Sequence, residues 1–313
     1  MPLWKILITD GLDENGQKIL RAAAQVDDRS GAILDELLQI IGEYDALIVR
    51  SRTKVTRPVF AAAPRLKVVG RAGVGVDNID LEAARQHAVC VVNAPAATTL
   101  AVAEQAMALM LALARRIPQA DAAMKAGRWI KNEISGVELS GKTLGIIGMG
   151  NVGHAVAERA AAFGMAALGY DPLLTEELIR QRSATPVPLE ELYARADFIS
   201  LHVPLSPGTR NMIAGQALAQ MKTGVRLICT ARGGLIDEAA LLQALESGQV
   251  AGAALDVFAS EPPGLTSLVA HPNLIATPHI SGQTREAQAR AAVDIAGEVL
   301  AALRGEALRW KVA

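Results

Sequence analysis

The sequence contains few cysteines and few aromatic residues. Two cysteines occur among 313 residues, and phenylalanine, tryptophan and tyrosine together make up 3% of the chain. Both cysteines, Cys90 and Cys229, lie inside apolar runs, so we expect buried thiols in a reducing compartment rather than a disulfide or a C-x-x-C pair. His87, His154 and His271 lack the spacing of metal ligands, and no metal site is expected.

The chain also has almost no excess charge and no long uninterrupted apolar run. Its 31 basic and 32 acidic side chains leave a formal net charge of −1, which gives no electrostatic reason to expect a nucleic acid or membrane partner. The most apolar long segment, Leu100–Ala114, is interrupted by Glu104 and is short for a bilayer. The start of the chain does not resemble a signal peptide. We therefore expect a soluble, cytoplasmic protein.

Apolar runs typical of strands alternate with helical segments along the chain. This alternation predicts an α/β fold of two Rossmann-like or flavodoxin-like domains, each a doubly wound parallel sheet, with a cleft between them. Strands are expected in the first block at Trp4–Thr9, Ala46–Val49, Lys67–Val69 and Val89–Val92, and helices at Glu14–Ala24, Ile33–Ile41, Pro58–Ala63 and Leu81–Gln86. Six further strands are expected at Thr143–Ile147, Ala166–Tyr170, Phe198–Leu201, Arg226–Cys229, Gly252–Asp256 and Leu274–Ala276.

The domain boundary is expected just after Asn93-Ala94-Pro95. A long helix follows at Thr98–Arg116, and Pro118 is expected to stop it. The last helix, near Thr284–Leu303, has no strand after it, so we expect it to pack on the first domain. These features predict a substrate-binding domain of residues 1–97 plus 284–313 and a cofactor-binding domain of residues 98–283.

A glycine-rich turn stands between an apolar run and an alanine-rich helical segment. Its sequence, Gly148-Met149-Gly150-Asn151-Val152-Gly153, matches the G-x-G-x-x-G pattern of dinucleotide-binding folds. The first glycine permits the tight turn, the second lets the backbone approach a pyrophosphate, and the third lets helix and strand pack closely. A plain strand–helix turn is the alternative.

Asp171 ends the next expected strand and bears on the choice of cofactor. A carboxylate at this place accepts hydrogen bonds from both ribose hydroxyls and repels a 2′-phosphate. No Arg or Lys follows it at once, so NAD is predicted rather than NADP. The alternative is a surface aspartate that closes a turn before Pro172.

Three polar residues follow successive strands of the second block, at the sheet edge where ligands bind. Arg232 follows one strand, Glu261 the next and His279 the last. Alone, each also fits an ordinary surface or loop residue. Together they suit removal of a hydride and a proton from a 2-hydroxy acid: His279 as base, Glu261 to orient its ring, and Arg232 as a planar fork for the substrate carboxylate.

The chain resembles the D-2-hydroxyacid dehydrogenase family along nearly its whole length, and within it the phosphoglycerate dehydrogenase branch. Besides the glycine turn, the resemblance is carried by Val49-Arg50-Ser51-Arg52-Thr53-Lys54-Val55-Thr56, Gly70-Arg71-Ala72-Gly73-Val74-Gly75-Val76-Asp77-Asn78-Ile79-Asp80, Val92-Asn93-Ala94-Pro95, Ala231-Arg232-Gly233-Gly234, Asp256 with Glu261-Pro262, and Pro278-His279.

The resemblance implies roles for individual residues. It implies an Arg232, Glu261 and His279 catalytic set and a homodimer or homotetramer joined through the cofactor domains. The implied cofactor contacts are Gly148, Gly150, Asn151, Val152, Gly153, Asp171, His202, Val203, Thr230, Ala231, Asp256 and Gly282; for His202, structural packing is the alternative. The implied substrate contacts are Arg50, Ser51, Arg52, Gly73, Val74 and Gly75 together with Arg232 and His279.

Arg50 and Arg52 could grip a phosphate, although alternation along an extended segment favours one of them facing solvent. The predicted reaction is therefore NAD-dependent oxidation of 3-phospho-D-glycerate to 3-phosphohydroxypyruvate, the opening step of serine synthesis. The alternatives are a hydroxypyruvate or glyoxylate reductase or another D-2-hydroxyacid dehydrogenase, and, more remotely, a corepressor-like protein that senses NAD(H). The chain ends at Ala313, so the serine-binding regulatory domain of many relatives, and feedback inhibition through it, are not expected.

Overall fold

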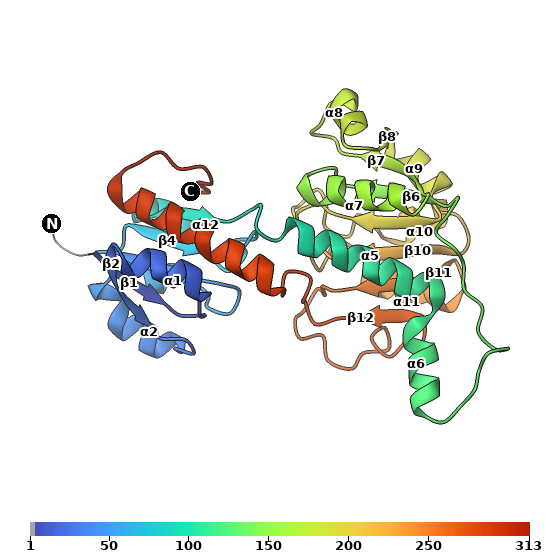
Figure 1. Ribbon diagram of the computed structural model, residues 1–313, viewed down its shortest axis with the longest axis horizontal. Helices are drawn as coiled ribbons and strands as arrows, with labels where there is room; N and C mark the ends of the chain where they lie inside the picture. Colours follow the sequence, from blue (N-terminus) through green and yellow to red (C-terminus); the bar gives the residue numbers. More distant parts are fainter. Residues whose placement is uncertain (1–3) are drawn as a thin grey trace. The chain divides into compact units, whose positions relative to one another are not determined.

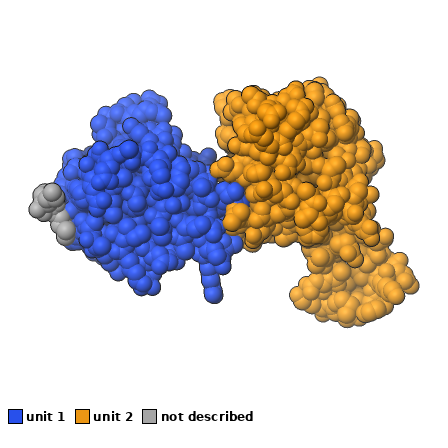
Figure 2. Space-filling view, turned by 45° about the horizontal axis from the view of Figure 1, so that its top comes forward, with its two compact units in different colours: residues 1–99, 282–313 blue, residues 100–281 orange. Residues whose placement is uncertain are grey.

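The computed structural model describes residues 4–313 and divides the chain into two compact units. The first unit consists of residues 1–99 and 282–313, and the second of residues 100–281 (Figure 2). Each unit is built around one parallel β-sheet, which confirms the predicted α/β class. Figure 1 labels most of the helices and strands of both units.

The first unit has a five-stranded parallel sheet with the strand order β2-β1-β3-β4-β5. This is the order of flavodoxin-like sheets, in which the chain direction switches between β1 and β3 and ligands bind beyond the carboxyl ends of those strands. The strands are β1 (Trp4–Ile8), β2 (Ala24–Asp28), β3 (Ala46–Val49), β4 (Val68–Arg71) and β5 (Cys90–Asn93).

Apolar residues on alternate positions of these strands bury both faces of the sheet. Leu7 and Leu47 pack with the helices of one face, and Ile6 and Ile48 pack with those of the other. The first face carries α2 (Leu34–Ile40), the 3-10 helix η1 (Ile41–Glu43), α3 (Arg57–Ala61) and α4 (Leu81–Gln86); the second carries α1 (Glu14–Arg21) and α12 (Arg285–Arg304).

Helix α12 packs on the first unit, as the sequence predicts. Its Ile295 and Val299 side chains lie against Gly70 of β4, where a Cβ would be 2.5 Å from Val299. A Cβ on Gly16 of α1 would stand 2.5 Å from the carbonyl oxygen of Ala292, so the two helices approach each other backbone to backbone. Thr284 caps the helix by accepting the N–H of Ala287.

The second unit has a seven-stranded parallel sheet with the order β12-β11-β10-β9-β6-β7-β8. Six of these strands follow the Rossmann order, and the chain direction switches between β6 and β9. The strands are β6 (Thr143–Ile147), β7 (Ala166–Tyr170), β8 (Thr185–Pro186), β9 (Phe198–Leu201), β10 (Val225–Cys229), β11 (Val250–Leu255) and β12 (Leu274–Ala276).

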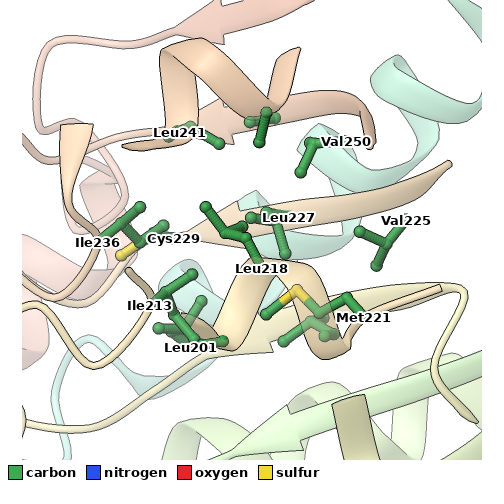
Figure 3. Packing of buried hydrophobic residues seen from close by; sticks show 14 of the residues in the cluster. Leu201, Ile213, Leu218, Met221, Val225, Leu227, Cys229, Ile236, Leu241 and Val250 are labelled. Carbon is green, nitrogen blue, oxygen red and sulfur yellow. The ribbon is translucent and has the colours of Figure 1, made fainter. Parts of the chain in front are cut away.

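Helices again cover both faces of this sheet. Leu227 and Cys229 of β10 face one cluster, shown in Figure 3, whereas Ile228 between them faces the other. The first cluster includes α9 (Leu189–Arg195), α10 (Gly215–Gln220) and α11 (Glu238–Glu246), and the second includes α5 (Thr99–Arg115), α7 (Asn151–Ala162) and α8 (Glu176–Gln181). Burial raises the pKa of the Cys229 thiol to about 11.

Three expectations about the elements were wrong. The segment expected to end the first helix, up to Ala24, instead begins strand β2, because Ala24–Asp28 pairs along the edge of β1. A seventh strand, β8, pairs with β7 through only two residues, too few to give a sequence pattern. Pro118 does not stop a helix but stands near the start of α6 (Ile117–Lys125), where its missing N–H costs no hydrogen bond.

The last residues of the chain lie along β5. Val312 donates its N–H to the carbonyl oxygen of Val91 at 2.8 Å, and Val91 donates to Ala313 at 2.9 Å. Buried Glu298 of α12 holds this tail by accepting the Arg309 and Trp310 N–H groups and the Arg309 guanidinium at 3.0–3.1 Å. Among residues 4–313, no helix combines the length and apolar character that crossing a bilayer requires.

Candidate active site and dinucleotide site

The first and third glycines of the turn after β6 are required by close packing. Gly148 has φ 93°, and a Cβ there would lie 2.5 Å from the carbonyl oxygen of His202. A Cβ on Gly153 would lie 2.0 Å from the carbonyl oxygen of Gly148. Helix α7 can therefore begin directly against β6 only because both positions lack a side chain.

The second glycine faces open space. Nothing lies within 4 Å of where a Cβ of Gly150 would be, although Gly150 immediately precedes α7. No side chain in the described part of the chain caps the helix, so its first-turn N–H groups, which include those of Asn151 and Val152, have no side-chain acceptor there. A pyrophosphate requires uncapped amides beside open space, and both are present here. The turn therefore fits a dinucleotide.

Asp171 lies at the same turn. Its Oδ2 accepts the N–H of Met149 at 2.9 Å, and its Oδ1 accepts the N–H of Leu173 at 3.0 Å. The carboxylate that follows β7 is thus fixed against the glycine turn, in the place where the fold puts the acid that binds the adenosine ribose. Asp171 also closes a turn with Pro172 and Leu173. A role in that turn and a role in ribose binding are therefore compatible.

His202 and Val203 follow β9 and support the glycine turn. The His202 carbonyl and the Val203 side chain are the groups that approach Gly148. The ring Nε2 of His202 lies 2.8 Å from the hydroxyl of Ser200, and burial lowers the pKa of His202 to about 4, so the ring is neutral at physiological pH. In the structure His202 and Val203 pack against the glycine turn.

Arg232 stands in the turn that follows β10. Its Nη1 donates to the carbonyl oxygen of Ala231 at 2.7 Å. A Cβ on Gly233 would be 1.8 Å from the carbonyl oxygen of Phe258, so this turn packs directly on the loop that leads to Glu261. Thr230, just before it, is buried, and its hydroxyl finds no hydrogen-bond partner among residues 4–313. An unpaired buried hydroxyl at this edge is a further feature that fits a bound ligand.

Glu261 and His279 form a hydrogen-bonded pair. Nδ1 of His279 lies 2.8 Å from Oε2 of Glu261, while Oε1 accepts the N–H of Phe258 at 3.2 Å. Because a carboxylate only accepts, the His279 proton sits on Nδ1, and Nε2 carries the lone pair of the neutral ring. Both side chains are partly exposed, at 48% and 39%.

The three strands that carry these residues are neighbours in register. Cys229 pairs with Leu255, and Leu255 pairs with Ala276, so β10, β11 and β12 end at one edge. The predicted juxtaposition of His279 with its acid is therefore present, and Arg232 lies on the adjacent turn. No cluster of three or more His, Cys, Asp or Glu side chains suited to a metal occurs within residues 4–313.

Asp256 is fully buried directly after β11. Its Oδ1 accepts the hydroxyl of Thr277 and the N–H of Ile280 at 2.9 Å, and its Oδ2 accepts the N–H of Ser281 at 2.8 Å and the Ser281 hydroxyl. His279, which has φ 52°, lies between these donors and donates its N–H to the Asp256 carbonyl. The carboxylate thus organises the segment that carries the histidine.

In the first unit, Arg50 lines a cavity of about 300 Å³. The other lining residues are Gly11, Leu12, Asp13, Ala72 and Gln288. The Arg50 guanidinium donates to Gln283 at 3.0 Å, and the neighbouring Gly282 carbonyl accepts Gln288 at 2.7 Å. Gly282 therefore belongs structurally to the first unit, whereas the other expected cofactor contacts belong to the second.

Arg52 is directed differently from Arg50, and Ser51 between them is exposed. The Arg52 guanidinium forms an ion pair with Asp10, with Nε at 3.2 Å and Nη2 at 3.1 Å, and also donates to the carbonyl oxygen of Thr9. Asp10 accepts the Arg50 and Thr53 N–H groups as well. Burial alone would raise the pKa of Asp10, but the hydrogen bonds from Thr53, Arg50 and Arg52 outweigh it and lower the pKa below its usual value.

The Gly73–Gly75 segment follows β4 as a turn in which Gly73 is buried and Val74 is exposed. Gly73 has φ 147°, and the Arg71 guanidinium occupies the place of a Cβ, 1.4 Å from Nη1. Asn93 fixes the turn by donating to the Val74 carbonyl at 2.7 Å. Among the described residues of the first unit, no backbone carbonyl accepts the Val74 or the Gly75 N–H, so both fit an anionic group.

Sequence reasoning assigned no role to four polar residues that shape these regions: Asp10, Asn78, Asn93 and Arg182. Asn78 and Asn93 do lie in motifs that carry the family resemblance. Asn78 donates to the carbonyl oxygens of Arg50 and Thr53, and Arg182 donates to that of Met149. A search for polar residues after every expected strand would have found Asp10, which follows β1. Arg182 has no such signal, because only the fold of α8 brings it to the glycine turn.

Residues 107–281, more than half of the chain, match the family described as D-isomer specific 2-hydroxyacid dehydrogenase, NAD binding domain. The chain belongs to this family. The chain is 50% identical over 303 residues to a D-3-phosphoglycerate dehydrogenase of Methanocaldococcus jannaschii, and this alignment covers 96% of the chain and 58% of that relative. The chain spans between 49% and 58% of the length of the curated relatives that it matches.

Solved structures match nearly the whole chain. A glyoxylate reductase from Paecilomyes thermophila has a TM-score of 0.90 at 31% identity and covers 100% of this chain and 99% of its own. A D-lactate dehydrogenase from Aquifex aeolicus, complexed with NAD and lactic acid, has a TM-score of 0.84 at 30% identity and covers 96% of each chain. The predicted family is thereby confirmed, and the match to its NAD binding domain supports the predicted NAD cofactor.

Proposed function

We propose that this D-2-hydroxyacid dehydrogenase oxidises 3-phospho-D-glycerate to 3-phosphohydroxypyruvate with NAD, the first step of serine synthesis. The observation that carries the proposal is the 50% identity to a D-3-phosphoglycerate dehydrogenase along 96% of the chain. The Arg50 cavity supports it, because a guanidinium lining a cavity suits a substrate that bears a phosphate.

In the proposed mechanism the second unit carries the chemistry. NAD supplies the hydride acceptor when it is bound at the glycine turn. Nε2 of His279 accepts the proton of the substrate hydroxyl, and Glu261, bonded to Nδ1, holds the ring and stabilises the imidazolium that forms. Arg232 binds the substrate carboxylate and the oxygen at C2 through its planar donor fork.

We assign the other substrate contacts to the first unit and cofactor binding to the second. Arg50 would bind the phosphate, and the N–H groups of Val74 and Gly75, with the turn at Gly73, would bind the carboxylate. Ser51 is exposed next to Arg50 and can add a hydroxyl donor. Arg52 is better described as the residue that fixes Asp10, since its guanidinium is already committed to that carboxylate and to Thr9.

A substrate panel tests the proposal. NADH formation or consumption is measured with 3-phosphoglycerate and 3-phosphohydroxypyruvate and with the unphosphorylated acids glyoxylate, hydroxypyruvate and pyruvate. We expect kcat/KM to favour the phosphorylated pair, and Arg50→Met to remove that preference while leaving activity on unphosphorylated acids. A preference of more than about tenfold for an unphosphorylated acid, about 1.4 kcal/mol in transition-state free energy, would refute the phosphate assignment.

The second candidate is a glyoxylate or hydroxypyruvate reductase. The likeness to the Paecilomyes thermophila glyoxylate reductase, at a TM-score of 0.90, favours it. The same catalytic set serves both reactions, so the panel alone decides between them. An absence of turnover with every acid, combined with tight NADH binding, would instead favour the corepressor-like sensor.

We also propose that the chain forms a homodimer or homotetramer in the cytoplasm. Three large apolar side chains on or after α6 support an interface between copies: Ile117, Met124 and Trp129, which are 52%, 55% and 76% exposed. Light scattering coupled to size exclusion measures the mass, and replacing Trp129 with Ser should shift the protein toward monomers. A monomeric wild-type protein at micromolar concentration would contradict the proposal.

A further inference from the structure

Arg182 lies at the end of α8, eleven residues beyond Asp171. Its half-buried guanidinium donates from Nη1 to the carbonyl oxygen of Met149, the second residue of the glycine turn. This is one of the five N–H donors that a guanidinium carries. The fold therefore brings a permanent positive charge to the turn from a place that the local sequence does not reveal.

The same residue, Met149, also contacts Asp171. Its N–H donates to Asp171 Oδ2 at 2.9 Å, while its side chain is fully buried against Gly169. One backbone position is thus held by a carboxylate through its N–H and by a guanidinium through its carbonyl. Within residues 4–313, no ion pair of 4.0 Å or less joins the two charged groups, so neither neutralises the other directly.

We propose that Arg182 is a second determinant of dinucleotide choice and gives the site measurable affinity for NADPH. A carboxylate at the end of β7 accepts the ribose hydroxyls and repels a 2′-phosphate. A guanidinium at the same turn attracts that phosphate through charge-assisted hydrogen bonds. The preference for NAD is then a balance between Asp171 and Arg182, and it is weaker than Asp171 alone would give.

The inference rests on cofactor binding at the glycine turn and is independent of which hydroxy acid reacts. It is tested by titrating the full-length protein with NADH and with NADPH, using the quenching of tryptophan fluorescence to obtain each Kd. The variants are Arg182→Met, Arg182→Lys, Asp171→Asn and the double variant Asp171→Asn/Arg182→Met. Thermal melting in the absence of cofactor confirms that each variant is folded.

The matched control is Arg180→Met. Arg180 belongs to α8 and is exposed, and among residues 4–313 its guanidinium forms an ion pair only with Glu176, one turn before it, at 3.1 Å. The control removes one positive charge from α8 without touching the glycine turn. We expect it to leave both dissociation constants within a factor of two.

For Arg182→Met we expect NADPH affinity to fall at least about tenfold, about 1.4 kcal/mol, and NADH affinity to fall less than threefold. Arg182→Lys should retain part of the NADPH affinity. Asp171→Asn should strengthen NADPH binding, and the double variant should lose that gain.

Four results would overturn the inference. Equal losses for both cofactors in Arg182→Met would show that the residue only supports the turn, and no loss for either would show that it is not used. Failure of the wild-type protein to bind NADH at all would reject cofactor binding at the turn as well, and the NADH titration separates that outcome from the others. A gain in Asp171→Asn that survives in the double variant would likewise assign NADPH binding elsewhere.

Discussion

Ser281 donates both its N–H and its hydroxyl to the buried carboxylate of Asp256. Thr277 and Ile280 donate to the other carboxylate oxygen, so four donors from one short segment converge on one acid. His279 stands inside this segment with a left-handed backbone, which a non-glycine residue adopts at an energetic cost. The position of the histidine is therefore determined by an acid that it does not itself touch with its ring.

Replacing Asp256 with Asn should displace the His279 segment. An amide offers one acceptor oxygen in place of two, and its NH₂ group would face donors, so buried N–H groups lose partners at about 1–3 kcal/mol each. We expect lower turnover and a lower melting temperature, measured by steady-state kinetics and calorimetry. Ser281→Ala, which removes only one hydroxyl donor, should have a smaller effect on both; an equal effect would contradict this account.

Replacing His279 with Ala should remove the proposed base. Turnover is expected to fall by about 10²–10⁴-fold, the usual contribution of a positioned acid or base. The NADH dissociation constant should change little, because the glycine turn and Asp171 belong to other strands. Glu261→Gln should give a smaller loss with the ring still held. Unchanged turnover in His279→Ala would remove the residue from the mechanism.

Glycines 150 and 153 should respond in opposite ways to alanine. Gly150→Ala places a methyl group in open space, so folding should be unaffected while NADH affinity falls at least about tenfold, about 1.4 kcal/mol. Gly153→Ala forces a methyl group to within 2.0 Å of a carbonyl oxygen and should lower the unfolding free energy itself. Chemical denaturation and NADH titration of the two variants separate the effects. Normal NADH binding by Gly150→Ala would contradict the assignment of a pyrophosphate-binding site next to Gly150.

Asp10 should stabilise the first unit in a pH-dependent way. Its pKa is lowered in the folded protein from the reference value of 3.8, so its contribution is complete above that value and is lost as the pH falls through the lower folded-state pKa. We expect Asp10→Asn to reduce the unfolding free energy by about 1–3 kcal/mol at pH 7 and pH 5 and by less at pH 3. Asp121→Asn, at an exposed surface pair, is the control and should stay within about 0.5 kcal/mol of wild type.

His202 should contribute to acid sensitivity. Burial lowers its pKa from 6.5 to about 4, so between these values the unfolded chain binds a proton that the folded chain does not. The unfolding free energy should therefore fall as the pH drops from 6.5 to 4, with this residue contributing up to about 1.4 kcal/mol per pH unit. His202→Gln should flatten that slope, whereas exposed His87→Gln should not. An unaltered slope in His202→Gln would show that the ring is already accessible to protons.

The sequence predicted most of the cofactor unit because its signals are local. The run from β6 through the glycine turn into α7, and the acid after β7, lie within thirty residues, so spacing alone placed Asp171 near the turn. His279 and Glu261 are separated by 18 residues but follow adjacent strands of a parallel sheet, so order along the chain sufficed to predict their contact.

Other features depended on contacts that spacing does not encode. Strand β2 has the sequence AQVDD, and its edge position, rather than its weak apolar pattern, makes it a strand. The ion pair between Arg52 and Asp10 joins residues 42 apart in the sequence. The hydrogen bond from Arg182 to the Met149 carbonyl depends on how α8 ends. Both arginines bind partners that only the folded backbone brings within reach of a long side chain.

The tail along β5 has a consequence for solubility. A sheet edge with unpaired N–H and carbonyl groups can recruit a strand from another molecule and start aggregation. In the first unit one edge is covered by residues near Val312, and the other edge, β2, carries the charged pair Asp27 and Asp28. Loss of the Glu298 anchor would expose the first edge, and the expected damage is self-association rather than a change in catalysis.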